Sequence, residues 1–184
     1  MATPIDLISN IPAVHAALVS RYTWFIHASP DVNIKAIRSY GLLPNRDAER
    51  PQYIVEAGIT GKLLCLYPLG AIQQPRPSAS TLVLPLGRDP KFVTYAVMRT
   101  DLPPRVGIDW SFERDKVERF LVNNPHLSVG DAALAIAHEY GSIVSYEEVS
   151  PNKLRVFCHG DPPTNPLGWK LLTQASDDQI ARQT

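Results

Sequence analysis

A histidine, a serine and a predicted helix start follow one another closely near the beginning of the chain. Residues 22–27 predict a strand of aromatic and β-branched residues that ends at His27, and Ser29-Pro30-Asp31 is typical of a helix start. An imidazole and a hydroxyl can both donate and accept hydrogen bonds, so this pair could bind the two hydroxyls of a ribose. Taken alone, His27 is explained more simply as a core histidine bonded to the backbone. Its position just before a capped helix favours ligand binding.

Two adjacent glutamates form a second candidate group. Glu147 and Glu148 lie in a strand predicted over residues 143–149, where successive side chains point to opposite faces. One carboxylate could then enter a cleft, hydrogen-bond a ribose 2′-hydroxyl and stabilise positive charge on the sugar as a glycosidic bond breaks. The simpler interpretation is that both are exposed charges at a strand end.

A tyrosine could complete such a site by stacking on a planar, cationic ring. Tyr67 ends a strand predicted over residues 62–67, and Tyr53 is the alternative for this role. Tyr67 is also explained as an ordinary amphipathic aromatic at the rim of a sheet. Tyr95, in the middle of a predicted strand, is expected in the core. The residues themselves leave the choice between Tyr67 and Tyr53 open.

The elements that must position these side chains form an α+β pattern, with strand clusters and interspersed helices. A single domain is expected over residues 1–172, followed by a polar tail, 173–184, that we expect to be frayed. Residues 101–109 are predicted to form a proline-rich connection between elements. Helices are predicted over residues 4–20, 112–123 and 132–140, the last capped near Ser128, and further strands over residues 81–86, 92–100 and 153–159.

Composition and motifs exclude several classes of function. Lys+Arg and Asp+Glu number 18 each among 184 residues, which argues against bulk electrostatic binding to nucleic acid or membranes. Cys65 and Cys158 lie in apolar runs and are expected to be buried free thiols. His138-Glu139 lacks the second histidine of a zinc protease, and His159 beside Cys158 has no partner pair at metal-ligand spacing, so no structural zinc is implied. No phosphate-binding glycine motif occurs either. The chain has neither a signal pattern nor an apolar run approaching the ~20 residues of a membrane span, so we expect a cytoplasmic protein.

The order of these pieces resembles ADP-ribosyltransferases of the His-Tyr-Glu type. The opening, Arg21 to Pro44, reads strand, His-x-Ser, helix, Gly-Leu-Leu, and is similar to that of the DarT-type enzymes, which are toxins that modify nucleic acid. The late phrase Glu-Val-Ser-Pro-Asn-Lys-Leu-Arg-Val is similar to the close of many such domains. The resemblance spans about residues 21 to 158 and implies a split mixed or antiparallel sheet core with short flanking helices.

The resemblance also implies a reaction and a role for each residue. NAD⁺ would be the substrate, with no metal: His27 and Ser29 would bind the adenosine-side ribose, and Tyr67 would stack on nicotinamide. Glu148, preferred over Glu147, would hold the nicotinamide-ribose 2′-hydroxyl and accept a proton from the acceptor. Arg46 or Arg50 would bind the diphosphate.

The acceptor stays open among a base in DNA or RNA, a protein side chain and water, which would make the chain an NAD⁺ hydrolase. A toxin or phage-defence role would require a neutralising antitoxin, and the rival class is a non-catalytic protein-binding module.

Overall fold

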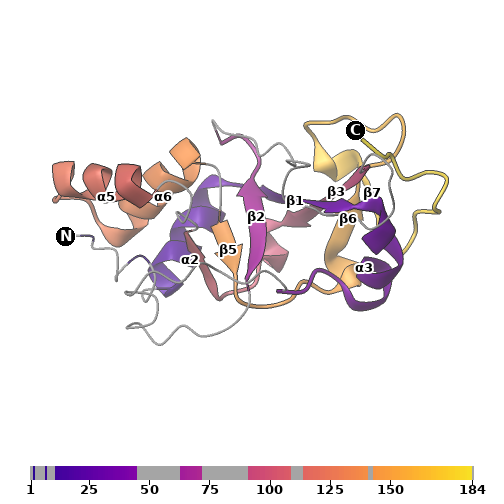
Figure 1. The fold of residues 1–184 in the computed structure, drawn as a ribbon, viewed down its shortest axis with the longest axis horizontal. Helices are drawn as coiled ribbons and strands as arrows, with labels where there is room; N and C mark the ends of the chain where they lie inside the picture. Colours follow the sequence, from indigo (N-terminus) through magenta and orange to yellow (C-terminus); the bar gives the residue numbers. More distant parts are fainter. Residues whose placement is uncertain are drawn as a thin grey trace.

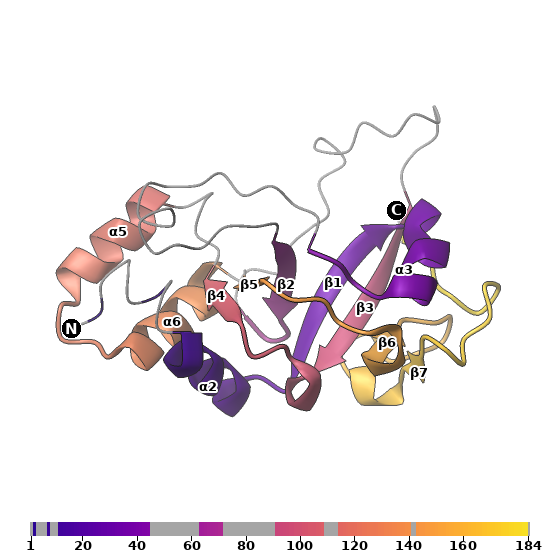
Figure 2. The same ribbon diagram turned by 90° about the horizontal axis from the view of Figure 1, so that it is seen from below.

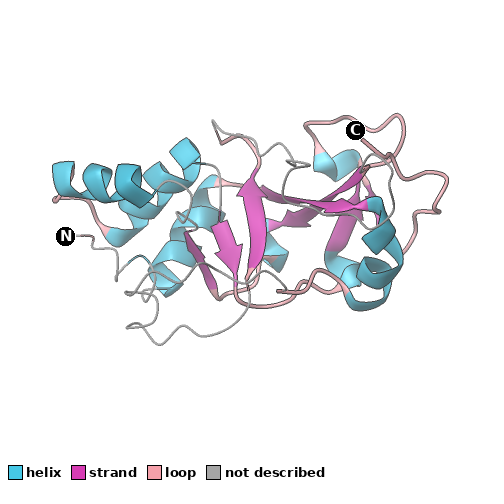
Figure 3. Ribbon diagram, viewed as in Figure 1, coloured by secondary structure: helices cyan, strands magenta, loops and turns pink. Residues whose placement is uncertain are grey.

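A computed structural model of the chain describes residues 2, 7, 11–44, 63–71, 91–108, 114–140 and 143–183. Within these ranges the protein is an α+β protein with a seven-stranded antiparallel sheet and four helices. Figure 3 shows the strands through the middle of the molecule, with helices at both ends. The predicted strand over residues 81–86 lies outside the described residues.

The sheet has the strand order β4-β5-β2-β1-β3-β6-β7, and all of its described pairings are antiparallel (Figure 1). A mixed sheet, which the resemblance also allowed, is therefore not found in this part of the chain. The strands are β1 (Trp24–Pro30), β2 (Leu64–Pro68), β3 (Phe92–Met98), β4 (Val106–Ile108), β5 (Ile143–Ser145), β6 (Leu154–Val156) and β7 (Lys170–Leu171).

The four described helices occupy opposite ends of the sheet. The helices α2 (Ile11–Arg21), α5 (Arg114–Asn123) and α6 (Val129–Tyr140) gather at one end, where α2 packs against α6 and β4 (Figure 2). The cap predicted for α6 is confirmed, since the Ser128 hydroxyl accepts a hydrogen bond from the Asp131 backbone N–H at 3.1 Å. The short helix α3 (Ile34–Tyr40) lies at the other end and buries Ile34 and Ile37.

The alternation of side chains along the strands defines two faces of the sheet. We call the first the core face, because its apolar residues belong to the main hydrophobic core; it carries Phe25, His27, Ser29, Leu64, Leu66, Tyr95 and Val97. We call the second the outer face; it carries a separate cluster of Trp24, Ala96 and Trp169. These assignments decide which candidate side chains can share a cavity.

The sheet is only narrowly joined between β1 and β2. The two strands pair at Phe25–Pro68 and Ile26–Tyr67, whereas β1 pairs with β3 along all seven of its residues. Beyond Ile26 and Tyr67 the β1–β2 ladder stops. The next residue of β1, His27, bonds to β2 through its side chain, at the Cys65 carbonyl oxygen, and lines a cavity.

Three expectations about the strands are corrected. The first strand extends to Pro30, so Ser29 does not cap a helix: it pairs with Val93 of β3, and α3 begins at Ile34 after a 3₁₀ turn. The stretch 101–109 was predicted as a connection but contains β4, which is too short to show an alternation in the sequence. The late strand predicted over residues 143–149 ends at Ser145.

The C-terminal segment was expected to be frayed, and the structure corrects this. Ile180 is fully buried and Ala181 is buried as well. Backbone bridges join Phe92 to Gln183 and Cys158 to Ile180, so residues 173–183 are packed against the sheet. The physical reason is that a few apolar residues among polar neighbours suffice to anchor a segment when its backbone is also paired.

Candidate functional site

A cavity of about 140 Å³ lies where β1, β2 and α3 meet. Two of its polar lining residues, His27 and Ser29, were predicted as ligand-binding residues from the sequence. The strand β1 supplies both, because they are two residues apart on the core face. The remaining lining comes from α3, its C-terminal end and β2: Asn33, Ala36, Ile37, Tyr40, Gly41, Leu42, Leu43 and Leu64.

The imidazole of His27 is fixed in orientation and in protonation state. Its Nδ1 lies 2.9 Å from the backbone carbonyl oxygen of Cys65, which can only accept, so Nδ1 carries the proton. Burial lowers the pKa of His27 below its usual value, and the hydrogen bond to Cys65 opposes this shift without reversing it. The neutral ring therefore keeps Nε2 as a hydrogen-bond acceptor, which suits a ligand hydroxyl.

We expect the stability of the protein to fall as the pH drops below about 6.5, the pKa of an unfolded histidine. The lowered pKa in the folded state means that the unfolded chain takes up the proton of His27 first. Stability should therefore rise with pH through this window and level off above it. Melting temperatures of the wild type and His27→Gln between pH 5 and 7.5 test this. If both lose the same stability on acidification, His27 does not cause the effect.

Ser29 is held against the floor of the same cavity. It is buried, and its hydroxyl oxygen accepts a hydrogen bond from the side-chain amide of Asn33 at 3.0 Å. The Ser29 proton is then available to a ligand that approaches from the cavity. Sequence reasoning missed Asn33 and Tyr40; the signal was the spacing of Asn33, Ile37 and Tyr40, which places them on one face of a helix.

The two glutamates lie at a different cavity, of about 420 Å³. Because β5 ends at Ser145, they do not alternate across a strand as expected. A carboxylate oxygen of Glu147 accepts a hydrogen bond from the backbone N–H of Arg105 at 3.2 Å, and Glu148 is exposed. The lining of this second cavity is Thr100, Asp101, Leu102, Pro103, Pro104, Glu147, Glu148, Val149, Ser150 and Lys153.

The two cavities share a boundary but not their polar groups. Leu42 lines the first cavity and Val149 the second, and the two residues exchange backbone hydrogen bonds of 2.9 Å each. On the core face, β5 presents Ile143 and Ser145, and the described residues that line the first cavity include no carboxylate. The structure therefore brings His27 and Ser29 together and leaves Glu147 and Glu148 beside them, across the Leu42–Val149 pair.

Tyr67 does not share a face with His27. It is paired with Ile26, one residue away from His27, so its side chain belongs to the outer face. Among the residues of β2, Leu64 lines the cavity of His27. Stacking of Tyr67 on nicotinamide stays a prediction, and this register places such a stack on the face opposite to His27. Tyr95 is fully buried on the core face opposite His27, as predicted for a core residue.

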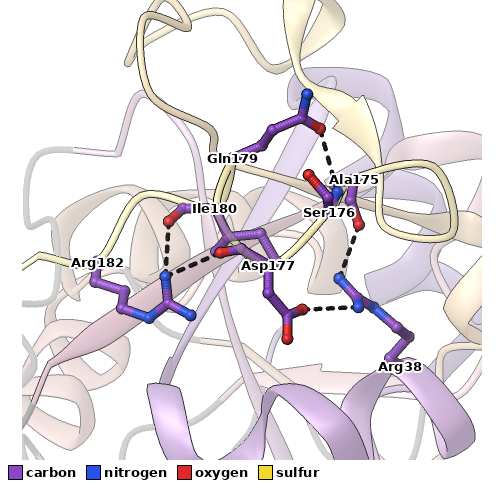
Figure 4. A network of polar contacts seen from close by, with 7 residues as sticks. All are labelled: Arg38, Ala175, Ser176, Asp177, Gln179, Ile180 and Arg182. Carbon is purple, nitrogen blue, oxygen red and sulfur yellow. Dashed lines mark hydrogen bonds and ion pairs between the residues drawn. The ribbon is translucent and has the colours of Figure 1, made fainter.

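Neither arginine predicted to bind the diphosphate is described by the structure, but Arg38, a further candidate for which a solvated helix position is the simpler interpretation, is. Tyr53, Arg46 and Arg50 lie outside the described residues. Arg38, on α3, lies 2.7 Å from a carboxylate oxygen of Asp177 and donates to the carbonyl oxygen of Ala175 at 2.8 Å (Figure 4). It therefore holds the C-terminal segment against α3.

Neither cysteine is among the residues that line the two cavities. Cys65 and Cys158 do not form a disulfide with each other, and Cys158 is buried while Cys65 is half-buried. Within the described ranges no group of three or more His, Cys, Asp or Glu residues could hold a metal ion. None of the helices in the described part of the chain is long and apolar enough to cross a membrane.

Comparisons of the chain with protein-family models, with curated proteins and with solved structures find no match. A functional assignment therefore rests on the residues that line the two cavities.

Proposed function

We propose that this protein is an NAD-dependent ADP-ribosyltransferase. The adenosine end of NAD⁺ binds at the first cavity, which we call the His27 cavity because His27 lines it. The observation that carries the proposal is His27 itself: its Nδ1–H is bound to Cys65, its Nε2 is left as an acceptor, and Ser29 lines the same cavity. This arrangement suits the hydroxyl pair of a ribose. The resemblance of residues 21–44 to the start of DarT-type enzymes supports the same assignment, as does the end of the β1–β2 ladder just before His27.

The transfer itself needs a carboxylate, which the second cavity can supply. In the proposed reaction the bond between nicotinamide and ribose breaks, and its electron pair leaves with nicotinamide. A glutamate carboxylate stabilises the positive charge on the sugar until the acceptor attacks, and the same carboxylate takes up the proton that the acceptor gives up. The shared Leu42–Val149 boundary supports an NAD⁺ that spans both cavities, with nicotinamide toward Glu147 and Glu148. Glu148 is the preferred residue, since Glu147 is bonded to Arg105.

The acceptor and the biological role follow from the resemblance only. We propose a base in DNA or RNA or a protein side chain as acceptor, with water as the alternative that makes the protein an NAD⁺ hydrolase. A role as a toxin or phage-defence effector in the cytoplasm, neutralised by an antitoxin, belongs to the same proposal.

Nicotinamide release from NAD⁺ by the purified protein tests the enzymatic proposal. We expect slow release that DNA, RNA or cell lysate accelerates, and that Glu148→Gln lowers by about 100-fold, since electrostatic stabilisation of a transition state is commonly worth this much. Glu147→Gln is the matched control and should retain most activity. Abolition by Glu147→Gln instead would reverse the assignment of the two residues, and no release under any condition would end the transferase proposal.

A non-catalytic binding module is the second candidate, and one observation favours it. The core face of β5 presents Ile143 and Ser145 beside Leu64, where a catalytic carboxylate would lie closest to the His27 cavity. A module of this kind would bind a ligand or a protein partner without chemistry. It predicts that no nicotinamide is released, and that Glu147→Gln and Glu148→Gln leave binding unchanged.

A further inference from the structure

The His27 cavity has polar groups on its floor and apolar groups at its mouth. His27 and Ser29 lie on the sheet, whereas Tyr40 and Leu43 are 68% and 43% exposed and line the same cavity. Single exposed apolar side chains are ordinary on protein surfaces. The exposed side chains of Tyr40 and Leu43, however, both lie beside one polar cavity. This arrangement suits a ligand that is polar at one end and flat and apolar at the other.

The ring of Tyr40 sits on a rigidly held helix end. Asn33, Ile37 and Tyr40 follow one another at the spacing of a single helix face, and Ile37 anchors this face in the core. The helix ends at Gly41, because the φ of 79° at this residue lies outside the helical region. The Gly41 N–H makes the last bond of the helix, to the Ile37 carbonyl oxygen at 2.8 Å, and Leu42 is then paired with Val149. Stacking on a side chain whose backbone is already ordered loses less conformational entropy than stacking on a mobile loop.

We propose that Tyr40 is the stacking platform for the adenine base of the bound nucleotide, with the attached ribose on His27 and Ser29. This inference rests on the proposed function, because it takes NAD⁺ as the ligand. A nucleoside matches the cavity in both parts: its sugar hydroxyls face the polar floor, and its flat base covers the exposed tyrosine at the mouth. Tyr40 thereby determines how tightly the adenosine end binds, and Tyr67, on the outer face, takes no part in it.

Calorimetric titration with two half-ligands tests the proposal. ADP-ribose contains adenosine without nicotinamide, and nicotinamide mononucleotide contains the opposite half. We expect Tyr40→Ala to weaken ADP-ribose binding by about tenfold, as base–aromatic stacking usually does on alanine substitution. Tyr40→Phe should bind within about twofold of the wild type, because the ring is kept. Val122→Ala, at another exposed apolar side chain on α5, is the matched control and should bind as the wild type does.

The outcomes separate this inference from the proposed function. If the wild type binds ADP-ribose and Tyr40→Ala binds it equally well, the stacking role is wrong while nucleotide binding stands. If Tyr40→Ala weakens only nicotinamide mononucleotide, the ring on Tyr40 is nicotinamide and the adenine assignment fails. If the folded wild type binds neither half, the inference and the proposed function fall together. Because Tyr40 is exposed, all three variants should melt close to the wild-type temperature, which shows that they are folded.

Discussion

Deleting residues 176–184 should lower the free energy of unfolding by on the order of 5 kcal/mol, which is comparable to the whole stability of many domains. The deletion removes the fully buried Ile180 and the backbone hydrogen bonds between Phe92 and Gln183, of 2.8 and 2.9 Å. It also removes the bond from the Ala181 N–H to the Phe157 carbonyl oxygen, at 3.0 Å. Urea unfolding followed by circular dichroism measures the loss.

Two point variants separate the deletion's apolar and ionic parts. Ile180→Ala should cost about 2–4 kcal/mol, as for other buried isoleucines. Arg38→Met removes the pair with Asp177, which is part-exposed, and should cost less than ~1 kcal/mol. Leu167→Ala, at a side chain that is 63% exposed, is the control and should have almost no effect. An unchanged unfolding midpoint in the truncated protein would show that the segment is frayed in solution, as its polar composition indicates.

The sequence predicted those elements whose own residues carry a strong local signal. The strands β1 and β3 are rich in aromatic and β-branched residues, α6 has a serine cap, and α3 ends at a glycine. The strand β4 was missed because it lies in a stretch whose prolines indicated a connection, and β7 was missed because two residues show no period. They exist because neighbouring strands supply hydrogen-bond partners, and this is information from distant parts of the chain.

The candidate site was predicted in part, and register explains the difference. His27 and Ser29 are only two residues apart, so the sequence placed them together, although Ser29 lies on the same strand as His27 and not at a helix start. Whether Tyr67 joins them depends on how β2 pairs with β1, and a shift of one residue moves its side chain to the other face. The glutamates depended on the length of β5, since the alternation expected for Glu147 and Glu148 ends with the strand at Ser145.

Gly41→Ala should disrupt both the fold and the cavity, at a cost of about 4 kcal/mol. Gly41 has φ of 79° and ψ of −165°, a conformation that is essentially restricted to glycine. A Cβ atom there would overlap the carbonyl oxygen of Val149 and lie 3.1 Å from Cδ of Pro151. These neighbours cannot yield easily, because that same oxygen accepts the hydrogen bond from Leu42.

Gly70→Ala is the matched control for this substitution. Gly70 also has a positive φ, of 96°, but among the described residues no atom beyond its chain neighbours lies within 4 Å of the place where its Cβ would be. It should therefore show only the backbone strain, about 1–2 kcal/mol. The difference between the two variants isolates the packing of Gly41 against Val149, the contact that separates the two cavities. If Gly41→Ala also loses ADP-ribose binding while Gly70→Ala keeps it, the end of α3 shapes the nucleotide cavity. Equal unfolding midpoints for the two variants would show that the backbone at Leu42 and Val149 can shift to accept the added methyl group at little cost. The packing of Gly41 against Val149 would then not stabilise the cavity.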